Sequence, residues 1–192
     1  TYDKRGNVLS YTRKDGSKIQ YRYDSEDHLL CKNAVSYAYD RMGSLVQMQD
    51  DSGTTIYTYN LAGSLTSVSQ NGAMVRYAYN AYDELVKIIY PDHVSATYAY
   101  DHNSNLIEAT CNGLTVMYAY DSLNREIGQS RSNGIVTLTD YDPAGNKSHI
   151  QTSVNGFPYF EAFYTYNRNN SLIKEEIRQL GEAIIKSYTY NE

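Results

Sequence analysis

The side chains of this 192-residue chain that most often bind metals or act in catalysis are four histidines and two cysteines. The histidines, His28, His93, His102 and His149, lie in or beside predicted turns and share no metal-ligand spacing. His28 lies near Cys31, but no second Cys-His group completes a site. We therefore predict no metal site and no cofactor.

Carboxylate pairs give no stronger indication of catalysis. Asp50-Asp51 and Glu175-Glu176 are not tied to a cleft, which two-carboxylate hydrolysis requires. The Asp/Asn-x-x-Gly turns lack the further oxygen ligands that calcium needs, and the sequence contains no phosphate-binding loop or nucleophile elbow. The sequence predicts no catalytic residue and no enzyme.

Tyrosine is the residue type with a regular arrangement. The chain has 22 Tyr against three Phe and no Trp. Pairs of the form Tyr-x-Tyr-Asp/Asn recur throughout the sequence. Positions i and i+2 of a strand face the same side, so both tyrosines of a pair are expected on one face of a sheet. The pairs are Tyr21 and Tyr23, Tyr37 and Tyr39, Tyr57 and Tyr59, Tyr77 and Tyr79, Tyr98 and Tyr100, Tyr118 and Tyr120, Tyr164 and Tyr166, and Tyr188 and Tyr190. Such rows could pack between strands or stack on sugar rings, and the sequence favours packing.

The spacing of these pairs defines a tandem repeat. From Tyr2 to Tyr190, the second tyrosines follow one another at intervals of 16 to 25 residues, most of them 20 or 21. A fixed short period overrides the usual estimate of domain number from length. We predict about nine repeats of roughly 20 residues over 1–192. The chain begins and ends at the same point of the motif, which predicts that it is part of a larger protein.

Each repeat carries two turn signals. The first is the Asp or Asn after the second Tyr, with a residue suited to positive φ four positions past that Tyr. Those residues are Gly6, Asp27, Gly43, Gly63, Asp83, Ser104, Asn124, Gly145 and Asn170, and all but Ser104 tolerate the left-handed region well. We expect a type I turn at each.

The second signal is typical of a β-hairpin. It reads Asp15-Gly16, Ser52-Gly53, Asn71-Gly72, Asn112-Gly113, Asn133-Gly134 and Asn155-Gly156, with Pro91-Asp92 and Leu180-Gly181 at the corresponding places of two other repeats. Asx-Gly between alternating strands predicts a type I′ turn. The sequence therefore predicts an all-β fold of antiparallel two-strand units, joined into a curved or spiralling sheet of the β-solenoid or shell type.

Four features depart from the regular pattern. Six residues past the second Tyr the residue is usually Leu, but Glu126 and Lys147 occupy this position in the seventh and eighth repeats, which we expect to be less regular. A tighter loop is expected near Asn33, and a strand end or longer hairpin tip at 157–160. The stretch 172–186 has partly helical spacing, but its turn signal favours two strands. Cys31 and Cys111 lie too many strands apart in one sheet for a disulfide.

Charge and hydropathy limit the partners. The net charge is −5 and no basic cluster stands out, so nucleic acid is excluded as a predicted partner. No run approaches the ~18 apolar residues of a membrane span. A sheet of this kind has two unpaired edges, and this predicts edge-to-edge self-association.

The motif resembles the tyrosine–aspartate (YD) repeat of the Rhs and teneurin family. Tyr39-Asp40-Arg41-Met42-Gly43-Ser44-Leu45 and Tyr59-Asn60-Leu61-Ala62-Gly63-Ser64-Leu65 carry the resemblance best, and it covers the whole chain. It implies a β-sheet that spirals into a hollow shell, enclosing a C-terminal toxin in bacterial members and supporting adhesion in animal ones. We expect the bacterial branch and a secreted or cell-surface location. Asp142-Pro143-Ala144-Gly145 is better explained as a repeat turn than as the family's self-cleavage region.

Two functions remain open at this stage. The first is a structural shell segment that encloses and protects a toxin cargo, with the rest of its own polypeptide as partner. The alternative is a cell-surface module that binds a glycan or a protein through exposed tyrosines. The structural residues in both are the Tyr pairs from Tyr37 to Tyr166 together with Gly43, Gly63, Gly72, Gly113 and Gly134.

Overall fold

The computed structural model describes residues 1–179 and 182–189. It consists of β-strands and turns, and by Cα proximity it divides into two compact units, Thr1–Ser95 and Ala96–Glu192. The described residues include no helix long and apolar enough to cross a membrane. The prediction of an all-β fold built from antiparallel two-strand units is confirmed.

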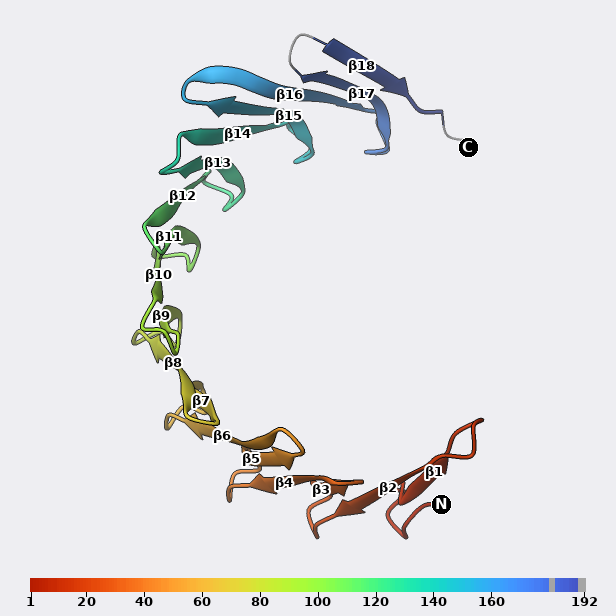
Figure 1. Cartoon of the computed structure of the whole chain (residues 1–192). Helices are drawn as coiled ribbons and strands as arrows, with labels where there is room; N and C mark the ends of the chain where they lie inside the picture. The colour runs from red at the N-terminus through yellow and green to blue at the C-terminus, as the bar shows by residue number, and fades with distance from the viewer. Residues whose placement is uncertain (180–181, 190–192) are drawn as a thin grey trace. The chain divides into compact units, whose positions relative to one another are not determined.

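The first unit is a meander of nine strands, in which each strand pairs with the next one along the chain (Figure 1). The strands are β1 (Ser10–Thr12), β2 (Lys18–Tyr23), β3 (Leu29–Lys32), β4 (Val35–Tyr39), β5 (Leu45–Asp50), β6 (Gly53–Tyr59), β7 (Leu65–Gln70), β8 (Ala73–Tyr79) and β9 (Leu85–Ile89).

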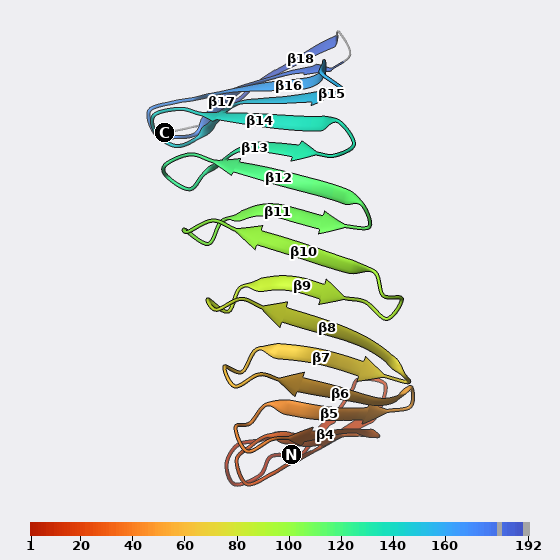
Figure 2. The ribbon, with the colours of Figure 1, turned by 90° about the vertical axis from the view of Figure 1, so that its left-hand side faces the viewer.

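The second unit repeats this arrangement, and its strands alternate in direction from one to the next (Figure 2). Its strands are β10 (Ser95–Tyr100), β11 (Leu106–Cys111), β12 (Leu114–Tyr120), β13 (Glu126–Arg131), β14 (Ile135–Tyr141), β15 (Lys147–Val154), β16 (Phe157–Tyr166), β17 (Leu172–Gln179) and β18 (Glu182–Ser187). Residues 172–179 and 182–187 are therefore strands, as predicted. The predicted turn at Leu180-Gly181 and the final Tyr190 lie outside the described residues.

The register is the same in repeat after repeat. The second tyrosine of each pair lies opposite the residue six positions later, as in Tyr39 opposite Leu45 and Tyr59 opposite Leu65, and a bulge precedes it. The prediction that the seventh and eighth repeats are less regular is wrong for the backbone. Tyr120 lies opposite Glu126 and Tyr141 opposite Lys147 in the same register and with the same bulge.

The sheet in each unit is a single layer without a globular core. Among described residues, the buried hydrophobic side chains are Ile19, Ala96 and Ala162. The paired tyrosines are partly buried, whereas the small residue between them, such as Ala38 or Thr58, is exposed on the opposite face. Alternation of this kind follows from the two-residue period of a strand. Stability must therefore come from contacts along the sheet.

The turns that follow the tyrosine pairs lie along one side of the sheet, where the strands end and the chain reverses. We call this row of turns the Asx-turn edge. In each turn the N–H of the fourth residue donates to the carbonyl of the Asx residue, as from Gly43 to Asp40 at 3.1 Å. All nine residues expected at positive φ have it, including Ser104 at 62°. The predicted type I turns followed by a left-handed residue are confirmed.

The opposite edge, the hairpin edge, consists of the turns between the two strands of each repeat. Both central residues have positive φ at Asn71-Gly72, Asn112-Gly113 and Asn155-Gly156, as a type I′ turn requires. Asn33 has a φ of 53° in the two-residue loop between β3 and β4, which confirms the tighter loop. Residues 157–160 begin β16, as a strand end.

Three of the predicted type I′ turns are wrong. At Asp15-Gly16 and Asn133-Gly134 only the glycine has positive φ, and its N–H donates three residues back, to the Arg13 and Arg131 carbonyls. These are wider turns of the type found at the Asx-turn edge. In the third case the loop is Asp51-Ser52, and Gly53 is the first residue of β6, with Asp50 opposite it. In these three turns a glycine lies at or next to the point where the chain reverses. Whether it falls inside the loop or in the following strand depends on how the two flanking strands pair.

Candidate functional site

The tyrosine hydroxyls connect successive repeats. The second tyrosine of a pair donates to the backbone carbonyl of the residue that opens the equivalent strand of the preceding repeat. Bonds of this kind run from Tyr39 to Leu29 at 3.1 Å, Tyr59 to Leu45 at 2.8 Å, Tyr79 to Leu65 at 2.9 Å, Tyr120 to Leu106 at 2.9 Å and Tyr166 to Lys147 at 3.0 Å, and Tyr141, which stands at the place of the second tyrosine, donates to Glu126 at 2.9 Å. We call these the inter-repeat tyrosine bonds.

The acceptor in these bonds explains why Glu126 and Lys147 fit the repeat. Because Tyr141 and Tyr166 bond to main-chain oxygens, the side chain at the acceptor position is free to vary. The tyrosine side chain is not free to vary in the same way, because phenylalanine has no donor. The sequence predicted that the tyrosine rows pack between strands, but it did not identify a partner for the hydroxyls.

Partial burial changes the acidity of these phenols. Desolvation raises the pKa of Tyr59, and the nearby Tyr57 and Asp40 raise it further. The pKa values of Tyr39, Tyr79, Tyr120 and Tyr166 are raised for the same leading reason. The hydroxyl therefore keeps its proton and acts as a donor under neutral conditions.

The Asx residue of each motif holds its own turn. One oxygen of Asp40 accepts hydrogen bonds from the backbone N–H groups of Met42 at 2.8 Å and Ser44 at 2.9 Å. The same two bonds, to the residues two and four positions on, are formed by Asp3, Asp24, Asn60, Asn80, Asp101, Asp121 and Asn167. Aspartate and asparagine are interchangeable here because the turn uses one acceptor oxygen.

Where this residue is aspartate, the turn also changes its acidity. Hydrogen bonds from the Asn105 side chain and then from its backbone N–H lower the pKa of Asp101. The backbone N–H of Arg125 and then its guanidinium lower the pKa of Asp121. These carboxylates are charged at neutral pH, and their charge favours the turn.

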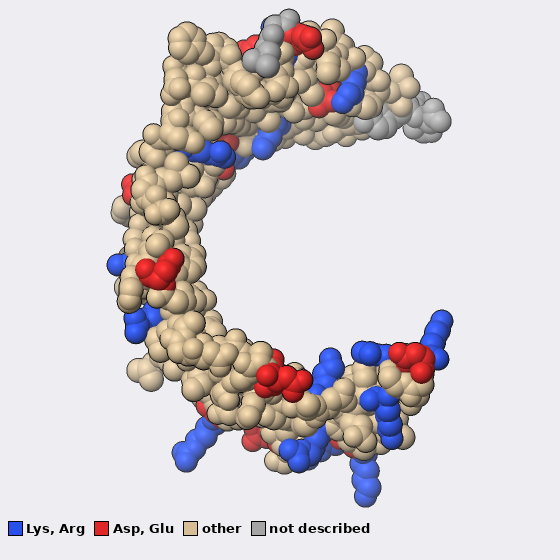
Figure 3. All heavy atoms as spheres, viewed as in Figure 1, with Lys and Arg blue, Asp and Glu red and all other residues tan. Residues whose placement is uncertain are grey.

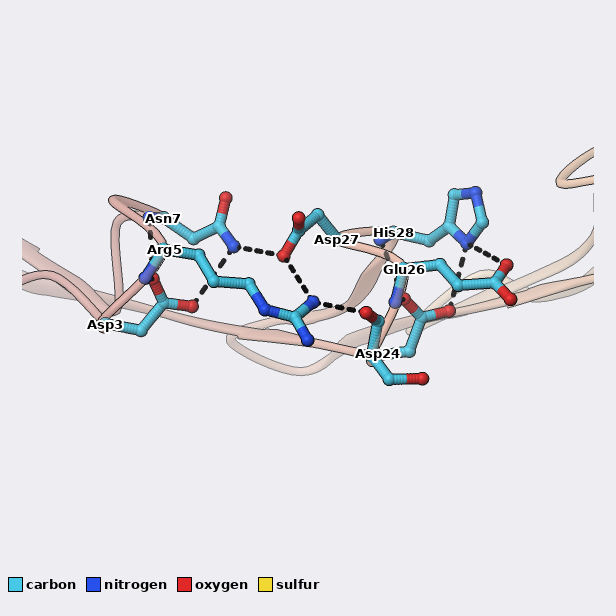
Figure 4. A network of polar contacts seen from close by, with 8 residues as sticks. Asp3, Arg5, Asn7, Asp24, Glu26, Asp27 and His28 are labelled. Carbon is cyan, nitrogen blue, oxygen red and sulfur yellow. Dashed lines mark hydrogen bonds and ion pairs between the residues drawn. The ribbon is translucent and has the colours of Figure 1, made fainter.

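Neighbouring Asx turns also contact one another through side chains. Figure 4 shows the first two turns: Asn7 donates to Asp27 at 2.7 Å, and the Arg5 guanidinium forms an ion pair with Asp27 at 3.1 Å and a hydrogen bond to the Ser25 carbonyl. His28 lies in the same network, 3.0 Å from Asp24. Because these groups are largely exposed, the ion pairs contribute little, and the network serves chiefly to align the turns.

One rule describes these turn-to-turn contacts. The residue five positions past the second tyrosine, which ends one turn, lies against the positive-φ residue of the next turn. When the positive-φ residue is Asp or Asn, it accepts a hydrogen bond from the residue that ends the preceding turn. Such bonds run from Ser64 to Asp83, from Asn105 to Asn124 at 2.9 Å and from Asn146 to Asn170 at 3.2 Å.

When the positive-φ residue is glycine, a larger side chain can lie over it. His28 lies above Gly43 and stacks on Tyr39, with ring centroids 4.8 Å apart. Arg125 approaches Gly145, and its guanidinium lies 4.3 Å from the centre of the Tyr141 ring. Both residues also bond the Asp of their own turn, at 3.0 Å and 2.7 Å. The sequence patterns did not reveal that these side chains cover the glycine of the next turn. His28 and Arg125 both stand five positions past the second tyrosine, but the residue type at this position varies from repeat to repeat.

The described residues contain no group of three or more His, Cys, Asp or Glu side chains that could hold a metal ion. Cys31 and Cys111 are both free.

Lys and Arg side chains project from the surface around the first strands, and carboxylates lie among them (Figure 3). The basic residues in this part of the sequence are Lys4, Arg5, Arg13, Lys14, Lys18 and Arg22.

Comparison with known protein families gives a match to these repeats. Residues 1–90 match the family model described as Teneurin YD-shell. Residues 1–90 of this chain are therefore similar to the repeats of a YD shell. No curated protein sequence matches the chain. The tyrosines and Asx residues of the YD repeat are those that make the inter-repeat tyrosine bonds and the Asx turns.

Solved structures share the fold of this chain over nearly its whole length. The crystal structure of TcdB2-TccC3-TEV superimposes with a TM-score of 0.77 at 15% identity, over 99% of this chain and 12% of that one. A TccC3 mutant of the Tc holotoxin pore of Photorhabdus luminescens superimposes with a TM-score of 0.69 at 14% identity, over 95% of this chain and 11% of that one. The chain thus spans about an eighth of the length of these structures. Family match and fold together indicate a structural shell role.

Proposed function

We propose that this YD-repeat region is a segment of a secreted shell that encloses and protects a polypeptide cargo of toxin type, carried by the same larger protein. The observation that carries the proposal is the series of inter-repeat tyrosine bonds in a sheet that has almost no core. Among the described residues no group of three or more His, Cys, Asp or Glu side chains could hold a metal ion. What the sheet builds is a continuous, hydrogen-bonded surface.

The proposal treats residues 1–192 as one repeat region and assigns it no catalytic role. It is supported by the family match and by the fold shared with TccC3-containing structures. One of these structures is TcdB2-TccC3 without its hypervariable C-terminal region. A variable segment attached to a constant shell fits a container whose content changes. The bacterial origin expected from the sequence is part of the same proposal.

Protease protection tests this function in the full-length gene product that contains these repeats. We expect a trypsin-resistant segment outside residues 1–192 in the native protein, which becomes cleavable when Tyr59, Tyr79 and Tyr120 are all changed to Phe. The matched control is Tyr82→Phe, because Tyr82 is 85% exposed at a turn. If no segment outside the repeats is protected in the native protein, the containment proposal is wrong.

The adhesion alternative stays a prediction, and a glycan array with Tyr→Ala variants at the same positions tests it. The hydroxyls of Tyr59 and Tyr79 already donate to backbone carbonyls, so a sugar would have to bind to the remaining ring faces. Saturable glycan binding that is lost when Tyr59, Tyr79 and Tyr120 are changed to Ala and retained in Tyr82→Ala would support adhesion in place of containment.

A further inference from the structure

The sequence contains four Asn-Gly pairs, and all four lie in turns at the hairpin edge. They are Asn71-Gly72, Asn112-Gly113, Asn133-Gly134 and Asn155-Gly156. An asparagine before glycine can be modified without an enzyme, because the glycine has no Cβ to keep its backbone nitrogen away from the asparagine side chain. The four turns differ in how firmly they hold the groups that react.

The modification is a deamidation in two steps, and water is the one other reactant. The glycine nitrogen forms a bond to Cγ of the asparagine, the Cγ–Nδ2 bond breaks, and Nδ2 leaves as ammonia with the proton of the glycine N–H. The product is a five-membered succinimide ring. Water then opens the ring at either carbonyl and gives aspartate or isoaspartate, in which the main chain is longer by one methylene group.

The first step requires two groups to be free. The asparagine side chain must turn toward the main chain, and the glycine N–H must be without another partner. A hydrogen bond that holds either group has to break before the reaction, and the net free energy of such a bond slows the step.

Asn71 is held by the preceding hairpin turn. Its Nδ2 donates to the Ser52 carbonyl at 2.8 Å, and its Oδ1 lies against Gly53, in the space that a Cβ there would need. Nδ2 is the amine that leaves in the reaction. The side chain must therefore give up its bond to Ser52 before it can react.

The two later pairs are held by contacts around Gly134. The Gly134 N–H, which would be the nucleophile for Asn133, donates to the Arg131 carbonyl at 2.9 Å. The Asn155 N–H donates to the Gly134 carbonyl at 2.8 Å, and Asn155 Oδ1 fills the space in which a Cβ on Gly134 would lie. Reaction at either asparagine must disturb these contacts.

The remaining pair is Asn112-Gly113, the exposed type I′ turn between β11 and β12 (Figure 2). Among the described residues, neither the Asn112 side chain nor the Gly113 N–H has a hydrogen-bond partner. The next hairpin turn contacts Thr115 instead: the Thr115 N–H donates to the Ser132 hydroxyl at 3.0 Å, and the Ser132 N–H donates to the Thr115 carbonyl at 2.8 Å. Both groups needed for the first step are therefore free at Asn112.

We propose that Asn112 is a self-modification site, at which asparagine converts to aspartate or isoaspartate faster than at the other three Asn-Gly pairs. The conversion places a negative charge at the tip of the hairpin. Isoaspartate also lengthens the main chain between Cys111 and Leu114, which lie opposite each other, so the two-residue turn loses its type I′ geometry. The proposal stands on the turn contacts and does not depend on the shell function.

Peptide mapping by mass spectrometry tests this site on the 1–192 chain. The chain is incubated in heavy-oxygen water at mildly alkaline pH, both folded and in urea, and the folded-state rate at each asparagine is divided by its rate in urea. This ratio removes the influence of the neighbouring side chains. We expect the ratio for Asn112 to exceed that for Asn71 by about tenfold, as the absence of one restraining hydrogen bond allows.

The other two pairs complete the comparison. The ratios for Asn133 and Asn155 should also be lower than that for Asn112. Equal ratios at all four pairs would overturn the proposal, as would a larger ratio at any of the other three. This measurement needs no substitution and so does not depend on whether a variant folds.

Matched variants provide a second readout. Asn112→Gly and Asn71→Gly both leave a Gly-Gly pair, which suits a type I′ turn. An isoaspartate-specific methyltransferase should label the aged wild-type and Asn71→Gly chains to a similar extent, and the aged Asn112→Gly chain much less. Equal labelling of Asn112→Gly and wild type would show that the modification occurs elsewhere and would overturn the proposal.

Discussion

The two edges of the sheet perform the same reversal of the chain in different ways. At the Asx-turn edge, every described turn has the same hydrogen-bonding pattern and a positive-φ residue at the same place. At the hairpin edge the turns vary, from type I′ at Asn71-Gly72 to a wider turn at Asn133-Gly134 and a proline-containing turn at Tyr90–His93, where the His93 N–H donates to the Tyr90 carbonyl.

The difference reflects how regularly the contacts of each edge with its neighbours recur from repeat to repeat. The Asx-turn edge lies beside the inter-repeat tyrosine bonds and carries turn-to-turn contacts in both units. The hairpin edge also contacts its neighbours, but with a different pair of groups each time: Asn71 donates to the Ser52 carbonyl at 2.8 Å, the Asn155 N–H donates to the Gly134 carbonyl at 2.8 Å, and the Thr115 N–H donates to the Ser132 hydroxyl at 3.0 Å. A turn whose contact with the next turn is the same in every repeat keeps one geometry, whereas turns with differing contacts can take several.

The largest expected difference between the edges comes from removing an Asx side chain. Asn60→Ala leaves the N–H groups of Ala62 and Ser64 without their acceptor, and we expect a loss of about 2 kcal/mol in the free energy of unfolding. At the hairpin edge, Asp50→Ala removes the hydrogen bonds from the Ser52 N–H and the Ser52 hydroxyl, so that one backbone N–H loses its acceptor, and it should cost about 1 kcal/mol. Urea unfolding of both variants provides the comparison. Equal losses would show that the two edges contribute alike.

A smaller effect is expected from the tyrosine hydroxyl beside the Asx-turn edge. Tyr59→Phe removes the 2.8 Å bond to the Leu45 carbonyl while keeping the ring, so we expect a loss of about 1 kcal/mol. Tyr82→Phe, at an exposed turn, should change the stability by less than about 0.5 kcal/mol. Urea denaturation followed by circular dichroism measures both. A Tyr59→Phe variant as stable as wild type would contradict a stabilising role for the inter-repeat bond.

Acid should weaken the Asx-turn edge where its first residue is aspartate. The lowered pKa values of Asp101, Asp121 and Asp142 mean that the folded state favours their ionised forms. This stabilisation is present above the unfolded-state pKa of about 3.9 and is lost as the pH falls through the lower folded-state values.

Changing these three residues to Asn should therefore flatten the loss of stability of the second unit below pH ~4. Asn60, Asn80 and Asn167 already form the same turns without titrating. Thermal unfolding as a function of pH checks this, and a triple variant with unchanged acid sensitivity would assign that sensitivity to other groups.

The smallest effect is expected between the two edges, at Gly128 in β13. Its φ is not in the positive range, and an added Cβ would lie 3.5 Å from Ala119 Cβ and from Leu138 Cδ2, in ordinary contact. Gly128→Ala should therefore stabilise the chain by about 0.5–1 kcal/mol, because glycine in a strand carries an entropic cost. A differential scanning measurement should show a higher Tm. A lower Tm would mean that the site does not accept a methyl group.

Sequence reasoning succeeded where one residue type has one local consequence. Asn or Gly at the turns predicted positive φ, and tyrosine alternation predicted strands. It failed where the outcome depends on a neighbouring strand. Glu126 and Lys147 suggested irregularity because an apolar position was assumed, whereas the contact there is to the main chain. Ser52-Gly53 was placed one residue late, because the loop is fixed by the pairing of Asp50 with Gly53.

The sequence alone determined the period, the all-β class, the nine left-handed positions and the family resemblance, because each follows from local backbone preferences repeated along the chain. Tertiary structure decided which atoms join one repeat to the next: the tyrosine hydroxyl with a carbonyl, the turn residue with its neighbour, and the Asn71 side chain with the Ser52 carbonyl. These partners lie up to 24 residues apart. They are brought together by strand register, which no single repeat specifies by itself.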